Sequence, residues 1–150
     1  MTLPQDFKEF LQLLKKHHVE YLVVGGYAVG AHGQPGDTSD IDIWLKISET
    51  NAQKLIQVIT EFDFGELGIE EQDFLAENNI IQMGVLPLRI DLMTSIEGVV
   101  FEQAYPKRDE ILVDDFLLDI ISYDDLVKNK SATGRLQDQA DVEKLKRNKK

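Results

Sequence analysis

The sequence contains no cysteine and no long hydrophobic run. The absence of cysteine excludes thiolate catalysis, cysteine-ligated zinc and iron–sulfur clusters. The longest mainly apolar stretch, residues 21–31, is too short for a membrane span, which needs about 20 residues. The N-terminal segment MTLPQDFKEFLQLLKK carries early acidic residues and no apolar block, so we predict no signal peptide. We therefore expect a cytoplasmic protein without a membrane partner.

Basic residues are scarce over most of the chain, whose net charge is −11. Residues 128–150 contain eight of the sixteen Lys and Arg and only three acids, so their net charge is +5. Residues 1–127 therefore have a net charge of −16. This distribution disfavours polyanion binding over most of the surface, so we expect no DNA partner. Between Lys54 and Arg89 there are seven acids and no base. That acidic stretch is either a solvated face or a docking surface for a basic partner.

Length and hydrophobic periodicity together predict the fold class. A chain of 150 residues is expected to form one domain and to bury roughly 70% of its unfolded surface. Apolar spacing and period-two alternation predict helices near residues 7–14, 27–32, 52–62, 97–105, 123–135 and 137–150, and strands near residues 21–24, 40–45, 80–86, 88–94, 110–113 and 116–121. The fold class is α/β (α+β), a mixed β-sheet flanked by helices. A single domain spans residues 1–150, with a C-terminal helical segment at about residues 122–150.

Two aspartates alternate with apolar residues in the segment DIDIWL, residues 40–45. Residues i and i+2 of a strand share a face with Cα atoms roughly 6.5 Å apart, so Asp40, Asp42 and Trp44 point the same way. Two adjacent carboxylates cost free energy unless a cation lies between them, and Mg²⁺ prefers oxygen ligands. The pair predicts a Mg²⁺ (or Mn²⁺) site, unless both aspartates face solvent on an edge strand. Trp44 either stacks on a base or packs at the strand end.

A pair of glycines, Gly25 and Gly26, lies between the apolar segment YLVV and the short helix YAVGAH. Free N–H groups at the start of a helix bind phosphate, and glycine lets an anion approach the backbone closely. A dinucleotide-binding fingerprint needs glycine at the position of Tyr27, and a P-loop needs lysine at the position of Ala31. We therefore predict a phosphate cradle of a different type.

A third carboxylate, Asp91, alternates with apolar residues in RIDLM. If this strand lies beside residues 40–45, Asp91 completes a triad with Asp40 and Asp42. Three carboxylates, two cations and a phosphate cradle are suited to in-line nucleotidyl transfer.

Together, the segments GGYAV, GQPGDTSDIDIWL and RIDLM resemble the minimal nucleotidyltransferases of the DNA polymerase beta superfamily. The segment LVKNKSATGRLQDQADVEKL is similar to the closing helices of bacterial members, in which K-x(4)-R-x-x-D-x-x-D recurs. Here that pattern comprises Lys130, Arg135, Asp138 and Asp141. The resemblance covers residues 21–145 apart from the acidic middle.

The resemblance implies a polymerase-beta-like nucleotidyltransferase fold and transfer of a nucleoside monophosphate from a nucleoside triphosphate, such as ATP, to a hydroxyl of RNA, protein or a small molecule. Three aspartates would bind Mg²⁺ or Mn²⁺, and the last would also orient or deprotonate the acceptor hydroxyl; they are Asp40, Asp42 and Asp91. Four residues are predicted to bind nucleotide: Gly25, Gly26, Ser39 and Lys130. Lys130 could equally lie on a solvated helix face. Small relatives occur in bacterial toxin–antitoxin systems, so a partner protein of that kind is implied.

One departure from the family pattern supports a second hypothesis. Many relatives carry an arginine just before the threonine of the turn, whereas Gly36 and Asp37 precede Thr38 here. An acid at that position would repel a triphosphate. The alternative is a non-catalytic, antitoxin-like interaction module that binds a partner protein through its acidic surface. A glycosyltransferase that binds a nucleotide sugar through D-x-D is disfavoured, because the paired glycines would have no role in it.

Overall fold

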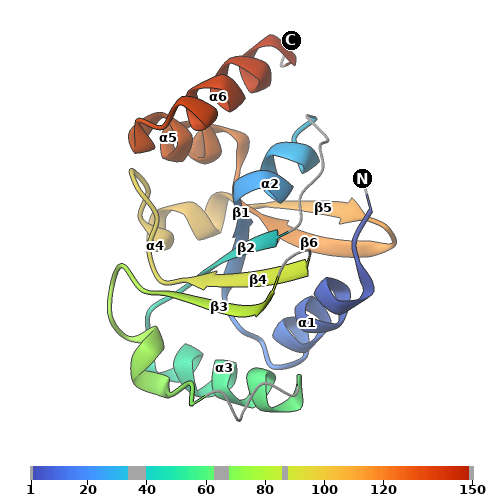
Figure 1. Ribbon diagram of the computed structural model, residues 1–150, viewed down its shortest axis with the longest axis vertical. Helices are drawn as coiled ribbons and strands as arrows, with labels where there is room; N and C mark the ends of the chain where they lie inside the picture. Colours follow the sequence, from blue (N-terminus) through green and yellow to red (C-terminus); the bar gives the residue numbers. More distant parts are fainter. Residues whose placement is uncertain (1, 34–39, 63–67, 86–87, 149–150) are drawn as a thin grey trace.

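The computed structural model describes residues 2–33, 40–62, 68–85 and 88–148. It contains both helices and strands, interspersed along the chain, which confirms the predicted mixed α/β class (Figure 1). In chain order they are α1 (Gln5–Lys16), β1 (Tyr21–Val24), α2 (Gly25–Ala31), β2 (Asp40–Leu45), α3 (Glu49–Glu61), η2 (Glu71–Phe74), β3 (Ile80–Val85), β4 (Leu88–Met93), α4 (Phe101–Ala104), η3 (Tyr105–Lys107), β5 (Asp109–Val113), β6 (Phe116–Ile120), α5 (Tyr123–Thr133) and α6 (Leu136–Asn148). Within these ranges no helix is long and apolar enough to span a bilayer.

All six strands belong to one mixed sheet in the order β3-β4-β2-β1-β6-β5. β2 runs parallel to β4 and antiparallel to β1, while β1 runs parallel to β6. In the β2–β4 register, Asp40 lies opposite Arg89 and Asp42 lies opposite Asp91. Because side chains alternate along a strand, these four residues share one face of the sheet.

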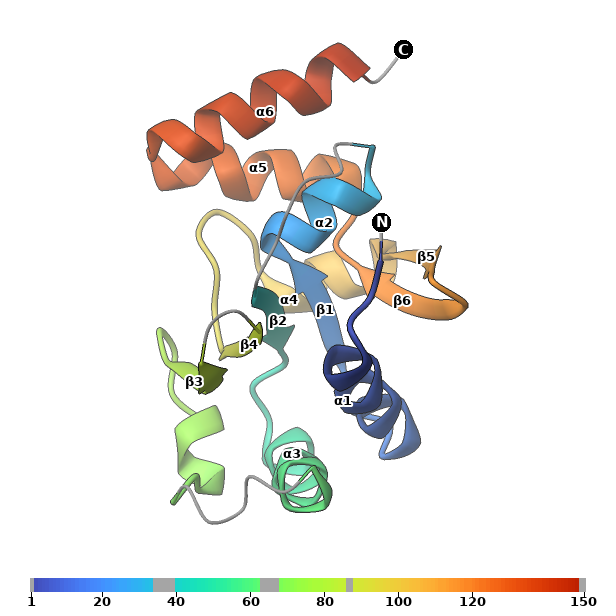
Figure 2. The same ribbon diagram turned by 45° about the vertical axis from the view of Figure 1, so that its right-hand side comes forward.

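The opposite face of the sheet carries the main hydrophobic core. Ile41 and Ile43 of β2 are fully buried. The same holds for the apolar residues Phe10, Leu11 and Leu14 of α1 and Ala52 and Leu55 of α3, whereas Ile56 and Phe62 are partly buried. Both helices lie together at one end of the molecule in the two views (Figures 1 and 2). The polar face of β2 and β4 is therefore left for another use.

The C-terminal segment forms a helical pair on the other side of the molecule. α5 lies beside α2, and α6 lies outside α5 (Figure 2). The hydroxyl of Ser122 accepts a hydrogen bond of 3.2 Å from the Asp125 N–H, as expected for the N-cap. The carboxylate of Asp125 forms an ion pair with Lys107 at 3.3 Å. α5 ends at Gly134, whose φ of 72° is left-handed.

The short helix predicted for residues 97–105 starts later than expected, because α4 comprises Phe101–Ala104 and continues directly into η3. Gly98 has a φ of 79°, and an isolated bridge joins Ile96 to Val99. Residues 96–99 therefore form a turn before the helix starts. At α2, the helix begins at Gly25, two residues earlier than predicted.

Candidate active site

The three predicted aspartates converge at neighbouring positions on β2 and β4. Each offers a carboxylate oxygen, and these oxygens lie within 4.8 Å of one another. Within the part of the chain that the structure describes, Asp40, Asp42 and Asp91 form the one group of three or more acids or histidines close enough to hold an ion. Asp40 and Asp42 are half-buried and Asp91 is buried. The triad inferred from the sequence is therefore assembled by the parallel pairing of β2 with β4.

Asp42 lies at the centre of this cluster and against the glycine turn. Burial and the neighbouring charges of Asp40 and Asp91 raise the pKa of Asp42 to about 7. A Cβ atom on Gly25 would overlap the Asp42 carboxylate, and the φ of 67° at Gly25 is also left-handed. Only glycine allows this approach without strain. An all-oxygen donor set with a reluctantly ionised member fits a hard divalent cation such as Mg²⁺ or Mn²⁺.

A cation of the chain itself, Arg89, lies in the same cluster. The Arg89 Nε donates to Oδ1 of Asp91 at 2.8 Å, and Nη2 donates to Oδ2 of Asp91 at 3.0 Å. Nη2 also lies 3.6 Å from Oδ2 of Asp40. The guanidinium thus links the acids of β2 and β4. Sequence reasoning missed Arg89, although the alternation in LRIDLM places it on the face of Asp91.

A cavity of about 1320 Å³ opens over this face of the sheet. Its lining includes the triad, both glycines of the turn, Arg89, and residues of α4, α5 and α6. Trp44 also lines it but is only 2% exposed and packs edge-on against Phe101, with ring centroids 5.1 Å apart. Trp44 therefore packs at the strand, as one of its two predicted roles required.

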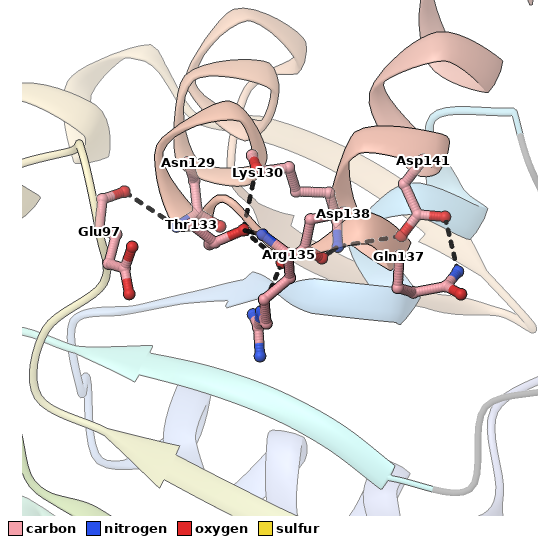
Figure 3. Close-up of polar contacts among 8 residues, drawn as sticks. All are labelled: Glu97, Asn129, Lys130, Thr133, Arg135, Gln137, Asp138 and Asp141. Carbon is pink, nitrogen blue, oxygen red and sulfur yellow. Dashed lines mark hydrogen bonds and ion pairs between the residues drawn. The ribbon is translucent and has the colours of Figure 1, made fainter.

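The helical pair α5–α6 contributes a network of charged residues to the roof of this cavity. The Lys130 Nζ lies 2.8 Å from Oδ1 of Asp138 and 3.1 Å from Oδ2 of Asp141. Oδ2 of Asp138 accepts hydrogen bonds of 2.7 Å from both Thr133 and Arg135 (Figure 3). Burial opposes the ionisation of Asp138, but the bonds from Lys130 and Thr133 outweigh it and lower the pKa of Asp138. The K-x(4)-R-x-x-D-x-x-D pattern is thus one contiguous network.

Lys130 does not lie on a solvated helix face, because its side chain is only 8% exposed. Its position in the cavity lining is compatible with the predicted contact to a phosphate, but both of its ion pairs are made within the chain. Nucleotide binding by Lys130 stays a prediction. Ser39, together with Gly36 and Asp37, lies outside the described residues.

Lys130→Met is expected to lower the free energy of unfolding by about 3 kcal/mol, because Asp141 loses its cation and Asp138 keeps only its ion pair with Arg135. Lys128→Met is a matched control, since Lys128 is an exposed lysine on the same helix. Urea unfolding of both variants measures the difference. Equal stability of the two variants would show that Asp138 and Asp141 do not depend on Lys130.

Comparison with known proteins locates this fold. No protein-family model and no curated protein sequence matches the chain significantly. Among solved structures, a protein of Thermotoga maritima assigned as a nucleotidyltransferase superposes with a TM-score of 0.61 at 14% identity, over 93% of this chain and 89% of its own. The chain has a nucleotidyltransferase fold. The lincosamide antibiotic adenylyltransferase LnuA, determined with lincomycin, gives a TM-score of 0.59 at 18% identity and covers 97% of both chains. The antibiotic-resistance factor ANT(2'')-Ia gives 0.57 at 12% identity, over 93% of this chain and 80% of its own.

Proposed function

We propose that the protein is a nucleotidyltransferase that transfers a nucleoside monophosphate from a nucleoside triphosphate to a hydroxyl acceptor. The observation that carries this proposal is the convergence of Asp40, Asp42 and Asp91 beside the Gly25–Gly26 turn, in a cavity large enough for a nucleotide and an acceptor. The fold shared with the nucleotidyltransferase structures supports it.

The carboxylates would hold the divalent ions, which, when bound, neutralise phosphate charge and polarise the reacting phosphorus centre. Gly25 and Gly26 would bring backbone N–H groups to the triphosphate. Asp91 would orient the acceptor hydroxyl and accept its proton. The acceptor oxygen then bonds to the α-phosphorus, the bond between the α- and β-phosphates breaks, and pyrophosphate leaves.

The lining of the cavity favours a small acceptor that is neutral or positively charged. Three exposed acids, Glu77, Glu97 and Glu102, line the cavity beyond the triad. Among the residues of this lining that the structure describes, the basic ones are Arg89, Lys130 and Arg135, and each forms an ion pair with an aspartate. An RNA acceptor would therefore meet carboxylates without unpaired cations. LnuA is a lincosamide antibiotic adenylyltransferase whose structure contains lincomycin, and the two chains match over 97% of their lengths. We extend a small-molecule acceptor of this kind to the present chain.

A nucleoside triphosphate with Mg²⁺ or Mn²⁺ is expected to stabilise the protein by about 2.7 kcal/mol at about 100 times its Kd. For a domain of this size the melting temperature rises by roughly 5 to 10 °C. Thermal unfolding with each of the four triphosphates, with and without metal, tests this. Melting curves that overlay the curve of the ligand-free protein in every case would contradict the proposed function.

One observation favours the non-catalytic interaction module as a second candidate. Arg89 pairs with Asp91 and Asp40 from within the chain, so part of the negative charge of the cluster is balanced without a metal ion. In that case the acidic surface would bind a partner protein, such as the other component of a toxin–antitoxin pair. The same melting experiment separates the candidates, because the interaction module predicts no response to triphosphate and metal.

A further inference from the structure

The carboxylate of Asp91 has two competing uses. In the proposed reaction it must bind a metal ion, yet both of its oxygens already accept hydrogen bonds from Arg89, at 2.8 and 3.0 Å. Each carboxylate oxygen has two lone pairs, so an ion could bind beside the guanidinium. The two positive charges would then lie only a few ångströms apart and repel each other in a partly buried site. Metal binding and the Arg89–Asp91 ion pair therefore oppose each other.

A phosphate bound in the same cavity would give Arg89 a second partner. Arg89 lies opposite Asp40, its side chain is 26% exposed, and it lines the cavity with Gly25 and Gly26. A guanidinium pairs with phosphate oxygens as readily as with a carboxylate, through the same two parallel hydrogen bonds. A triphosphate bound at the glycine turn would offer those oxygens.

The other cations of the cavity differ from Arg89 in their partners. Lys130 and Arg135 are paired with Asp138, which lies outside the triad. Among the described cavity residues, Arg89 is the cationic residue that pairs with the predicted metal ligands, Asp40 and Asp91. Only the release of Arg89 is thus coupled directly to metal binding.

We propose that Arg89 competes with the metal ion for Asp91, and that the Arg89 guanidinium moves to the phosphates when nucleotide and metal bind together. This inference rests on the proposed function. In the metal-free protein, Arg89 holds Asp40 and Asp91 at their positions and keeps the affinity for metal alone low. A triphosphate gives the guanidinium a new partner and so raises the affinity for metal. Metal and nucleotide therefore bind with positive cooperativity.

The test compares the full-length wild type with Arg89→Gln and, as a matched control, Arg108→Gln. Arg108 is a partly exposed arginine paired with Asp119 at 3.5 Å, away from the cavity lining. Mn²⁺ alone is titrated first, with the unbound ion followed by its paramagnetic resonance signal. Arg89→Gln is expected to bind Mn²⁺ about tenfold more tightly than the wild type, since removal of a charged hydrogen-bonding competitor is worth roughly that factor. Arg108→Gln is expected to match the wild type.

Calorimetric titration with each triphosphate in saturating Mn²⁺ follows. Arg89→Gln is expected to bind triphosphate about tenfold more weakly than the wild type, because the fork to the phosphates is lost. Arg89→Lys keeps the charge without the fork. It should shift both affinities in the same directions by smaller factors, and it replaces the glutamine variant if that variant does not fold.

The outcomes separate this inference from the proposed function. If Arg89→Gln and the wild type bind Mn²⁺ equally, Arg89 is a fixed structural partner and the competition is wrong, whereas triphosphate binding would still support the transferase. Tighter Mn²⁺ binding by Arg89→Gln, with no triphosphate bound by any protein, supports the competition and contradicts the proposed function. Absence of Mn²⁺ binding by all three proteins overturns the competition, and absence of triphosphate binding in Mn²⁺ by all three contradicts the proposed function.

Discussion

Asp91→Asn is expected to transfer nucleotide about 10² to 10⁴ times more slowly than the wild type while it keeps its fold. Asparagine preserves the size of the side chain but can neither accept the acceptor proton nor contribute a charged metal ligand. Loss of the metal ligand adds to the loss of the base, so the upper part of this range is expected. Arg89 retains Asp40 as a partner at 3.6 Å, which limits the structural effect of the change.

The measurement uses radiolabelled triphosphates with separate pools of small molecules, transfer RNA and protein from a cell extract. Asp115→Asn is the matched control. It makes the same chemical change at an exposed turn position, where the φ of 68° suits asparagine. If the wild type labels an acceptor and Asp91→Asn labels it equally well, Asp91 is not part of the catalytic machinery. Labelling confined to transfer RNA would contradict the acceptor class inferred from the acidic lining.

The sequence was sufficient to single out the three aspartates as candidates, because each one interrupts an apolar strand. In DIDIWL the alternation alone places Asp40 and Asp42 on one face. The juxtaposition of Asp42 with Asp91 depends on β2 pairing in parallel with β4, although β3 lies between them in the chain. The spacing of residues along the sequence cannot predict that β2 pairs with β4. The resemblance to the polymerase beta superfamily indicated this pairing.

Partners made by tertiary structure could not be predicted in the same way. The role of Arg89 depends on its cross-strand neighbour Asp40 as well as on Asp91, which follows it by two residues. Lys130 is buried because α6 folds back over α5 and brings Asp138 and Asp141 to its ammonium group. Helix periodicity could assign Lys130 to a face but could not say what would cover that face.

Local structure was predicted least well where glycine departs from the common backbone angles. At Gly98 a left-handed φ ends the turn before α4, and the helix predicted around it starts only at Phe101. At Gly25 the left-handed φ has another purpose, because it allows the carboxylate of Asp42 to lie against the backbone. The glycine pair was predicted to serve a phosphate, and its close contact with the triad was not foreseen.

Asp42→Asn is expected to reduce transfer by more than about 10³ through loss of a metal ligand at the centre of the cluster, and also to change the pH dependence of stability. The pKa of Asp42 is raised to about 7 by burial and by the charges of Asp40 and Asp91. The folded protein thus holds a proton that the unfolded chain releases near its ordinary pKa of about 4. Stability of the metal-free wild type should fall as the pH rises from about 4 to about 7, and the penalty should be complete above that range.

The expected loss of stability is on the order of 2 kcal/mol. It is smaller than the free energy that corresponds to the whole pKa shift, because Asp42 is only half-buried and solvent screens its charge. Asparagine cannot ionise, so the metal-free variant should be more stable than the wild type at about pH 8 and should approach it at about pH 5. Added Mg²⁺ or Mn²⁺ should stabilise the wild type at the higher pH and leave the variant unchanged. Urea unfolding in chelator and in metal, over this pH range, measures both effects. If the free energy of unfolding depends on pH in the same way for the wild type and Asp42→Asn, the pKa of Asp42 is not raised and its burial does not favour a bound cation.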